Sequence, residues 1–195
     1  AETKAEQEIE VIYANYIREG WQNVIGTSGT IKSILTMVNA QNPQQAFINI
    51  DLKDAHLIFI GSGNSEECLR DTIRKFKNIH FVGFQNQQSL PIWYRIGNII
   101  CLPSISETWG LVINEAMASG CAPLVSKTIG CSEDILPQAQ VTGLFPPQDS
   151  SYLAELLGVY AKIQWDRKSI QKHISHWSFS EIIEAIRMEM NRMKQ

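Results

Sequence analysis

Short apolar runs alternate with segments of helical periodicity along the middle of the chain, and this alternation constrains the fold most. The continuous apolar run from His56 to Ile60 is typical of a strand in a parallel sheet that is covered on both faces. Short connections without a hairpin signal such as Asn-Gly indicate right-handed crossovers between parallel strands. The predicted strands are 21–25, 56–60, 79–82, 99–102, 122–125 and 143–145, and the predicted helices are 3–18, 30–40, 65–77, 88–96, 109–119, 149–162 and 182–190. The predicted fold class is therefore α/β, with a Rossmann-like parallel sheet and helices on both of its faces.

Composition and charge exclude several classes of protein. The 195 residues are 44% hydrophobic and 19% charged, as in an ordinary globular domain, and their number predicts a single domain, 1–195. No apolar run reaches the roughly 18 to 20 residues of a membrane-spanning helix, and the polar start AETKAEQEIE does not resemble a secretory signal. We therefore expect a cytoplasmic protein without a membrane span. The 17 Lys and Arg residues form no basic run against 20 Asp and Glu, which argues against a nucleic-acid partner.

Cysteine and histidine spacing does not indicate a metal site or a disulfide framework. The four cysteines show no C-x2-C pair, and we expect them to be reduced thiols in or near the core. His173 and His176 have helical i, i+3 spacing, which in principle suits a metal ion, but no carboxylate or thiol motif accompanies them. No metal and no cofactor is therefore predicted.

The segment after the predicted strand 99–102 carries the most informative pattern. In open parallel sheets, ligands bind at the carboxyl ends of the strands. Here Glu107 precedes a predicted helix and Glu115 lies about two turns inside it. The first turn of such a helix suits a diphosphate, and Glu115 could accept hydrogen bonds from vicinal ribose hydroxyls. From spacing alone, an alternative is equally open, in which Glu107 and Thr108 only favour the helix start and Glu115 is solvent-exposed.

The surrounding residues resemble the C-terminal, nucleotide-sugar-binding half of retaining GT-B glycosyltransferases, the group marked by an E-x7-E motif. The resemblance covers 55–150 closely and continues more loosely to about residue 190, where Trp177-Ser178-Phe179 looks like the start of the family's closing helix. The matching landmarks, in chain order, are the strand and glycine turn Ala55 to Gly63, Ile79 to Gly83, Pro103-Ser104, Glu107 to Glu115 with Glu-Ala-Met-Ala-Ser-Gly behind it, Gly120, Pro123, Gly130, Glu133 and Gly143.

This resemblance implies a donor site for a UDP- or GDP-sugar, with electrostatic stabilisation of the diphosphate leaving group and no requirement for a metal. Glu107 and the backbone N–H groups that follow it would face the donor sugar and the phosphates, while Glu115 would hold the ribose. The end of the strand at Val82-Gly83 would lie near the base. The site residues so predicted are Glu107 as the catalytic group, and Glu115, Trp109, Gly110, Leu111, Lys32, Val82 and Gly83 as ligands of the nucleotide sugar.

The beginning of the chain departs from the family pattern. The family clamps the diphosphate with an arginine and a lysine, but Thr27 stands at the arginine position, and only Lys32 has the spacing of the lysine. Gly26 to Gly29 is predicted to form a tight turn. The stretch Gly20 to Lys32 resembles a segment of exopolyphosphatases and guanosine-pentaphosphate phosphohydrolases, so the chain is interpreted as a chimera of a helix-strand-loop-helix segment, 1–42, and a glycosyltransferase-like part, 43–195.

Three functions remain open at this stage. The first is nucleotide-sugar donor binding without sugar transfer, because the resemblance implies an acceptor domain for which 195 residues leave no room. The second is a recombined scaffold with no function beyond folding, and the third is a phosphohydrolase fragment. The family's closing helix normally packs partly against the acceptor domain, so apolar surface should remain exposed and support a homo-oligomer. The residues expected on that surface are Trp177, Phe179, Ile183, Ile186 and Met190.

Overall fold

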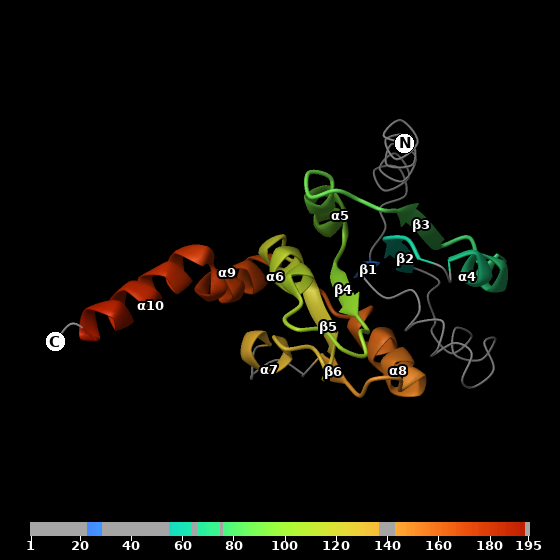
Figure 1. Ribbon diagram of the computed structural model, residues 1–195. Helices are drawn as coiled ribbons and strands as arrows, with labels where there is room; N and C mark the ends of the chain where they lie inside the picture. Colours follow the sequence, from blue (N-terminus) through green and yellow to red (C-terminus); the bar gives the residue numbers. More distant parts are fainter. Residues whose placement is uncertain (1–22, 29–54, 64–65, 75, 137–142, 194–195) are drawn as a thin grey trace.

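One six-stranded parallel sheet organises the molecule (Figure 1). A computed structural model describes residues 23–28, 55–63, 66–74, 76–136 and 143–193, with the backbone alone for 23–28. The predicted helices 3–18 and 30–40, and Lys32 with them, lie outside these residues. The strands are β1 (Asn23–Ser28), β2 (Ala55–Ile60), β3 (Ile79–Gly83), β4 (Ile99–Leu102), β5 (Ala122–Ser126) and β6 (Leu144–Phe145).

The strand order is β3-β2-β1-β4-β5-β6, which is that of a doubly wound sheet. All five pairings are parallel, as predicted. The central strand β1 comes from the segment 1–42 and pairs with β2 on one side and β4 on the other. Ligand-binding loops in such a sheet gather at the carboxyl edge, on either side of this strand.

The predicted turn at Gly26 to Gly29 is wrong for its first three residues. Gly26, Thr27 and Ser28 continue β1, with Thr27 paired to both Phe59 and Cys101. β2 provides backbone partners for all three residues, and β4 does so for Gly26 and Thr27, so the glycine remains in the ladder. Glycine and small polar residues favour turns only where such partners are lacking.

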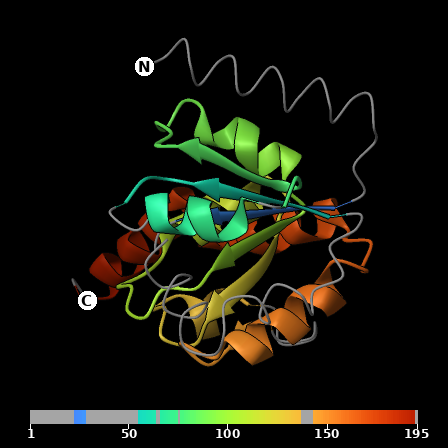
Figure 2. The same ribbon diagram turned by 90° about the vertical axis from the view of Figure 1, so that its right-hand side faces the viewer.

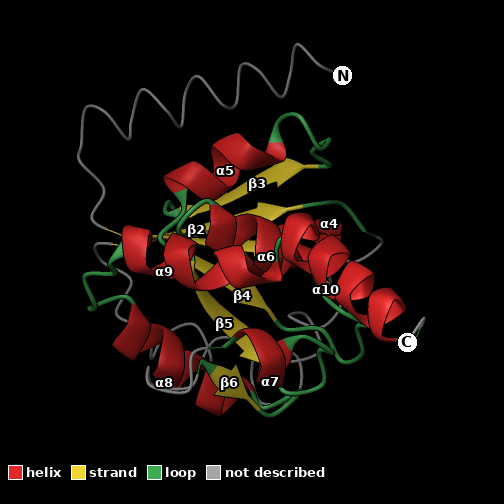
Figure 3. Ribbon diagram, turned by 90° about the vertical axis from the view of Figure 1, so that its left-hand side faces the viewer, coloured by secondary structure: helices red, strands yellow, loops and turns green. Residues whose placement is uncertain are grey.

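Helices cover both faces of the sheet, which confirms the predicted fold class. Figures 1 and 2 show α4 (Glu66–Ile73) and α8 (Ser150–Tyr160) on one side. On the other side, Figure 3 shows α5 (Leu90–Ile96), α6 (Leu111–Ala118) and α9 (Arg167–Ile174). The remaining elements are α7 (Ser132–Ile135), the short 3-10 helix η1 (Ser175–Trp177) and α10 (Phe179–Arg192). Among the described helices, α7, α9 and η1 were not predicted from the sequence.

The core lies between these helices and the sheet. Every residue of β4 and β5 is buried, which explains why 99–102 and 122–125 are continuously apolar rather than alternating. Ile113 and Met117 of α6 pack into the same core with no exposed surface. Three of the four free cysteines are also buried, and burial raises the pKa of the Cys101 thiol to about 12. These cysteines therefore serve as small core residues, as expected.

Candidate functional site

The loop between β4 and α6 is held by backbone contacts to the segment that follows β5. Glu107 forms an isolated parallel bridge with Ile129, and its carbonyl oxygen accepts a 3.1 Å hydrogen bond from the Gly130 N–H. The Cys131 N–H donates to the Trp109 carbonyl at 3.0 Å. A Cβ atom at position 130 would overlap the carbonyl oxygen of Thr108, so only glycine fits there. The path of the loop, and with it the start of α6, is therefore set by close backbone packing.

The amino terminus of α6 faces the carboxyl edge of the sheet. Gly110 is the N-cap residue, with φ of 95°, and it has no side chain that could cap the first turn. Ile113 N–H bonds back to the Gly110 carbonyl at 2.8 Å, while Leu111, the first helical residue, is 60% exposed. The first N–H groups of a helix lack intrahelical acceptors and carry the positive end of its dipole. This end of α6 can consequently receive an anionic group.

Trp109 is half-buried beside this turn. Its indole N–H donates to Asn114 Oδ1 at 3.0 Å, which fixes the ring against α6. The side chain therefore shapes the wall of the turn, and its indole donor is already used within the protein.

Glu115 lies on the exposed side of α6 and lines a pocket of about 390 Å³ between α5 and α6. The Tyr94 hydroxyl, which also lines this pocket, donates to Glu115 Oε2 at 3.3 Å. Burial raises the pKa of the Tyr94 phenol well above its ordinary value, and the Glu115 carboxylate adds to the shift. The phenol is therefore a fixed hydrogen-bond donor at neutral pH. The pocket is lined by Gln87, Leu90, Pro91, Tyr94, Glu115 and Ser119.

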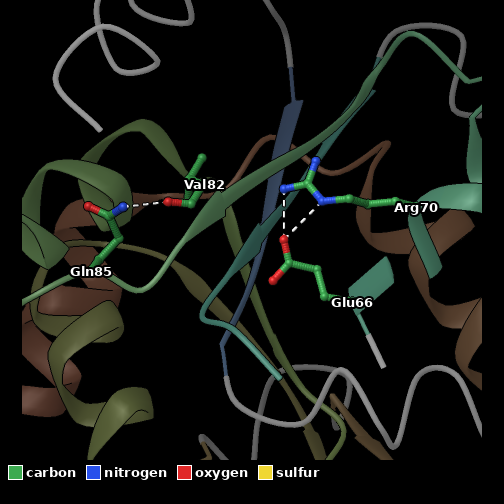
Figure 4. Close-up of polar contacts among 4 residues, drawn as sticks. All are labelled: Glu66, Arg70, Val82 and Gln85. Carbon is green, nitrogen blue, oxygen red and sulfur yellow. Dashed lines mark hydrogen bonds and ion pairs between the residues drawn. The ribbon is translucent and has the colours of Figure 1, made fainter. Parts of the chain in front are cut away.

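Val82 and Gly83 end β3 at the same edge of the sheet. Val82 is buried, and its carbonyl oxygen accepts a 2.6 Å hydrogen bond from the buried Gln85 amide (Figure 4). The Gly83 carbonyl accepts from the Gly61 N–H at 2.7 Å, which ties the end of β3 to the end of β2.

The 2.8 Å ion pair between Arg70 and Glu66, also drawn in Figure 4, lies within α4 and stabilises that helix.

The structure thus places five of the eight predicted site residues in α6 and the loop before it, and two, Val82 and Gly83, at the end of β3. The eighth, Lys32, lies outside the described residues. Glu115 lines the pocket, but Glu107 is exposed and does not line it. Sequence reasoning missed Tyr94, Gln87 and Ser119. Tyr94 lies three residues after Pro91, so the sequence does indicate that both lie on one face of α5. The contact of Tyr94 with Glu115 on α6 depends on tertiary packing, which the sequence does not indicate.

The family model described as "Glycosyl transferases group 1" matches residues 28–173 of this chain. The chain belongs to this family. The match includes every predicted site residue from Lys32 to Glu115, so the E-x7-E segment lies within the family domain. It also covers part of the segment 1–42, and the exopolyphosphatase-like origin of that segment remains a prediction.

Related proteins agree with this assignment. An uncharacterized glycosyltransferase from Methanocaldococcus jannaschii is 28% identical over 137 residues, which cover 69% of this chain but only 32% of that protein. The structure is similar to sucrose-phosphate synthase from Thermosynechococcus elongatus, with a TM-score of 0.65 at 23% identity over 88% of this chain and 45% of that one. A pneumococcal O-GlcNAc transferase, solved with UDP and GlcNAc, has a TM-score of 0.66 at 17% identity over 87% of this chain and 35% of that one. The chain thus spans less than half of each of these three proteins and has the fold of one part of them.

Two further observations concern the described residues. None of the helices there combines the length and the hydropathy needed to cross a membrane. The described part of the chain also holds no group of three or more His, Cys, Asp or Glu side chains suited to a metal ion.

Proposed function

We propose that this domain binds the nucleoside diphosphate part of a UDP- or GDP-sugar as the donor half of a glycosyltransferase. The observation that carries the proposal is the arrangement at α6. The amino terminus of this helix lies just after Glu107 and has no side-chain cap, and Glu115 lines a pocket at one side of the same helix. Family membership supports the same class of ligand.

The diphosphate would lie against the first turn of α6. The N–H groups of Gly110 and Leu111 are candidates to bind its oxygens, since the helix dipole favours negative charge at this end. Such preorganised donors also stabilise the charge that develops on a diphosphate leaving group. Glu107, exposed beside this turn, would face the donor sugar, and Lys32 would add a cation.

The nucleoside would extend from the diphosphate toward α5. Glu115 would accept hydrogen bonds from the ribose hydroxyls, with its carboxylate held by the Tyr94 phenol. The base would lie toward the end of β3, near Val82 and Gly83. We expect weak binding and no sugar transfer by this chain alone, because Thr27 replaces a cation of the family pattern and the acceptor half is not part of these 195 residues.

Calorimetric titration with UDP, GDP and ADP tests the proposal. Replacing Glu115 by alanine should weaken binding by about one to two orders of magnitude, the value of a lost charged hydrogen bond. Glu155→Ala is the matched control, since it removes an exposed glutamate from α8 on the opposite face of the sheet. Nucleotide binding that is tight and unchanged in Glu115→Ala would refute this site. Polyphosphate hydrolysis that depends on Gly26 to Lys32 would instead favour the phosphohydrolase function.

A further inference from the structure

Arg167, the first residue of α9, connects the carboxyl ends of α5 and α6. Its Nη1 donates to the Gly97 carbonyl at 2.7 Å. Its Nη2 lies 2.8 Å from the Ser119 carbonyl oxygen, 3.0 Å from that of Arg95 and 3.4 Å from that of Tyr94. Three of these carbonyls close α5 and the fourth closes α6, so one side chain binds both helix ends.

An arginine suits this position for electrostatic and geometric reasons. The last carbonyls of a helix lack intrahelical donors and carry the negative end of the dipole. A guanidinium stays protonated and presents a planar set of N–H groups that reaches several acceptors at once, which a lysine ammonium cannot do in the same geometry. The Cys121 thiol donates to the same Tyr94 and Gly97 carbonyls, at 2.9 and 3.3 Å. The end of α5 is therefore held from two directions.

The backbone at Gly120 leaves room for the arginine. A Cβ atom there would lie 2.9 Å from Arg167 Cβ and 3.0 Å from Nε, and Gly120 has φ of 91°, a conformation that other residues rarely adopt. The close approach of α9 to the end of α6 thus depends on a residue without a side chain.

We propose that Arg167 is a positioning residue for the nucleotide pocket. The two helices that it joins carry Tyr94 and Glu115, which both line that pocket and are hydrogen-bonded to each other at 3.3 Å. Ser119, whose carbonyl Arg167 binds, lines the pocket as well. By holding the helix ends together, Arg167 keeps the Glu115 carboxylate in place for a ribose. The ligand named in this inference rests on the proposed function, whereas the positioning of Glu115 does not.

A measurement without ligand tests the positioning. The measurement is the 13Cδ chemical shift of Glu115 in the folded protein, with the resonance assigned by its loss in Glu115→Gln. Arg167→Lys should change this chemical shift in the same direction as Tyr94→Phe does. Lys168→Arg, an exchange of the neighbouring exposed cation on α9, should leave it in place. If Arg167→Lys does not fold, Arg167→Gln takes its place, since it keeps a planar amide donor. An unmoved Glu115 resonance in a folded variant overturns the inference.

A second measurement tests the effect on binding. Arg167→Lys should lower the affinity for UDP or GDP, whichever the unaltered chain binds more tightly, by about tenfold. It should lower the affinity for inorganic pyrophosphate by less than about twofold, because in the proposed site Glu115 contacts only the ribose. The tenfold effect should disappear in the Glu115→Gln background. Equal weakening of nucleotide and pyrophosphate would show a general structural role and overturn the inference. If the unaltered chain binds no nucleotide, the proposed function fails, and the Glu115 resonance alone decides the role of Arg167.

Discussion

Helices α6 and α10 both carry apolar residues at helical spacing, yet only α6 buries them. Ile113, Ala116 and Met117 of α6 have no exposed surface. In α10, by contrast, no residue is buried, and Ile186 is 55% exposed. Figure 1 shows the reason: α6 packs between the sheet and α9, whereas α10 extends away from the body of the domain.

The difference shows what apolar periodicity can establish. It identifies the face of a helix that favours burial, but not what covers that face. The exposed stripe of α10 includes Phe179, Ile183, Ile186 and Met190, as expected from the resemblance. The same expectation was wrong for Trp177, which is only partly exposed because its ring packs against the core and His173.

A matched pair of isoleucines should give the largest contrast. Ile113→Ala in α6 should lower the free energy of unfolding by about 2 to 5 kcal/mol, because it leaves a cavity in the core. Ile186→Ala in α10 should change it by less than about 0.5 kcal/mol. Urea denaturation measures both. Equal losses would mean that α10 packs in solution against a surface as tight as the core.

A matched pair of glycines should give a smaller contrast. Gly130→Ala should cost about 1 to 3 kcal/mol and reduce nucleotide affinity, because the new methyl group collides with the Thr108 carbonyl and displaces the loop before α6. Gly158→Ala in α8, where a Cβ meets nothing within 4 Å, should stabilise the helix by up to about 1 kcal/mol. Thermal unfolding and calorimetry with UDP distinguish the two. Unchanged affinity in Gly130→Ala would separate the loop from the binding site.

Local sequence predicted most of the fold, because strands buried on both faces are continuously apolar and therefore conspicuous. The boundaries of β4 were predicted to the residue, and those of β2, β3 and β5 to within one residue. Two α-helices of the described residues were missed for physical reasons. α7 has only four residues, and α9 is mostly polar, with Ile170 and Ile174 as its buried residues. Asp166, which caps α9, was its clearest available signal.

The site was predictable only in part. The E-x7-E spacing places Glu107 before α6 and Glu115 on it. Both positions could be predicted because they depend only on where this one helix begins. Tyr94 and Arg167 act through contacts to residues 21 or more positions away, and no local pattern encodes such pairings. They became visible once α5, α6 and α9 were packed together.

The apolar stripe of α10 should also drive association between copies of this chain. Burying one isoleucine side chain contributes about 1.5 to 3 kcal/mol, so Ile186→Glu should weaken self-association by more than about tenfold. Met188→Glu, on the other side of the same helix, should have little effect. Sedimentation velocity at increasing concentration measures the change. A strict monomer at high concentration would show that the exposed stripe of α10 does not mediate self-association.

The smallest contrast concerns the caps of two neighbouring helices. Asp166 accepts from the Lys168 and Ser169 N–H groups at 3.0 and 3.3 Å, and Ser178 accepts from the Glu181 N–H at 3.3 Å. Removing a cap costs about 0.5 to 2 kcal/mol when the helix unfolds with the rest of the protein. Because α9 packs on α6, Asp166→Ala should lower the global stability by about 1 kcal/mol. Ser178→Ala should leave global stability unchanged and only speed amide exchange in the first turn of α10, since an unpacked helix can fray independently. Equal losses of global stability from both variants would show that α10 unfolds cooperatively with the sheet.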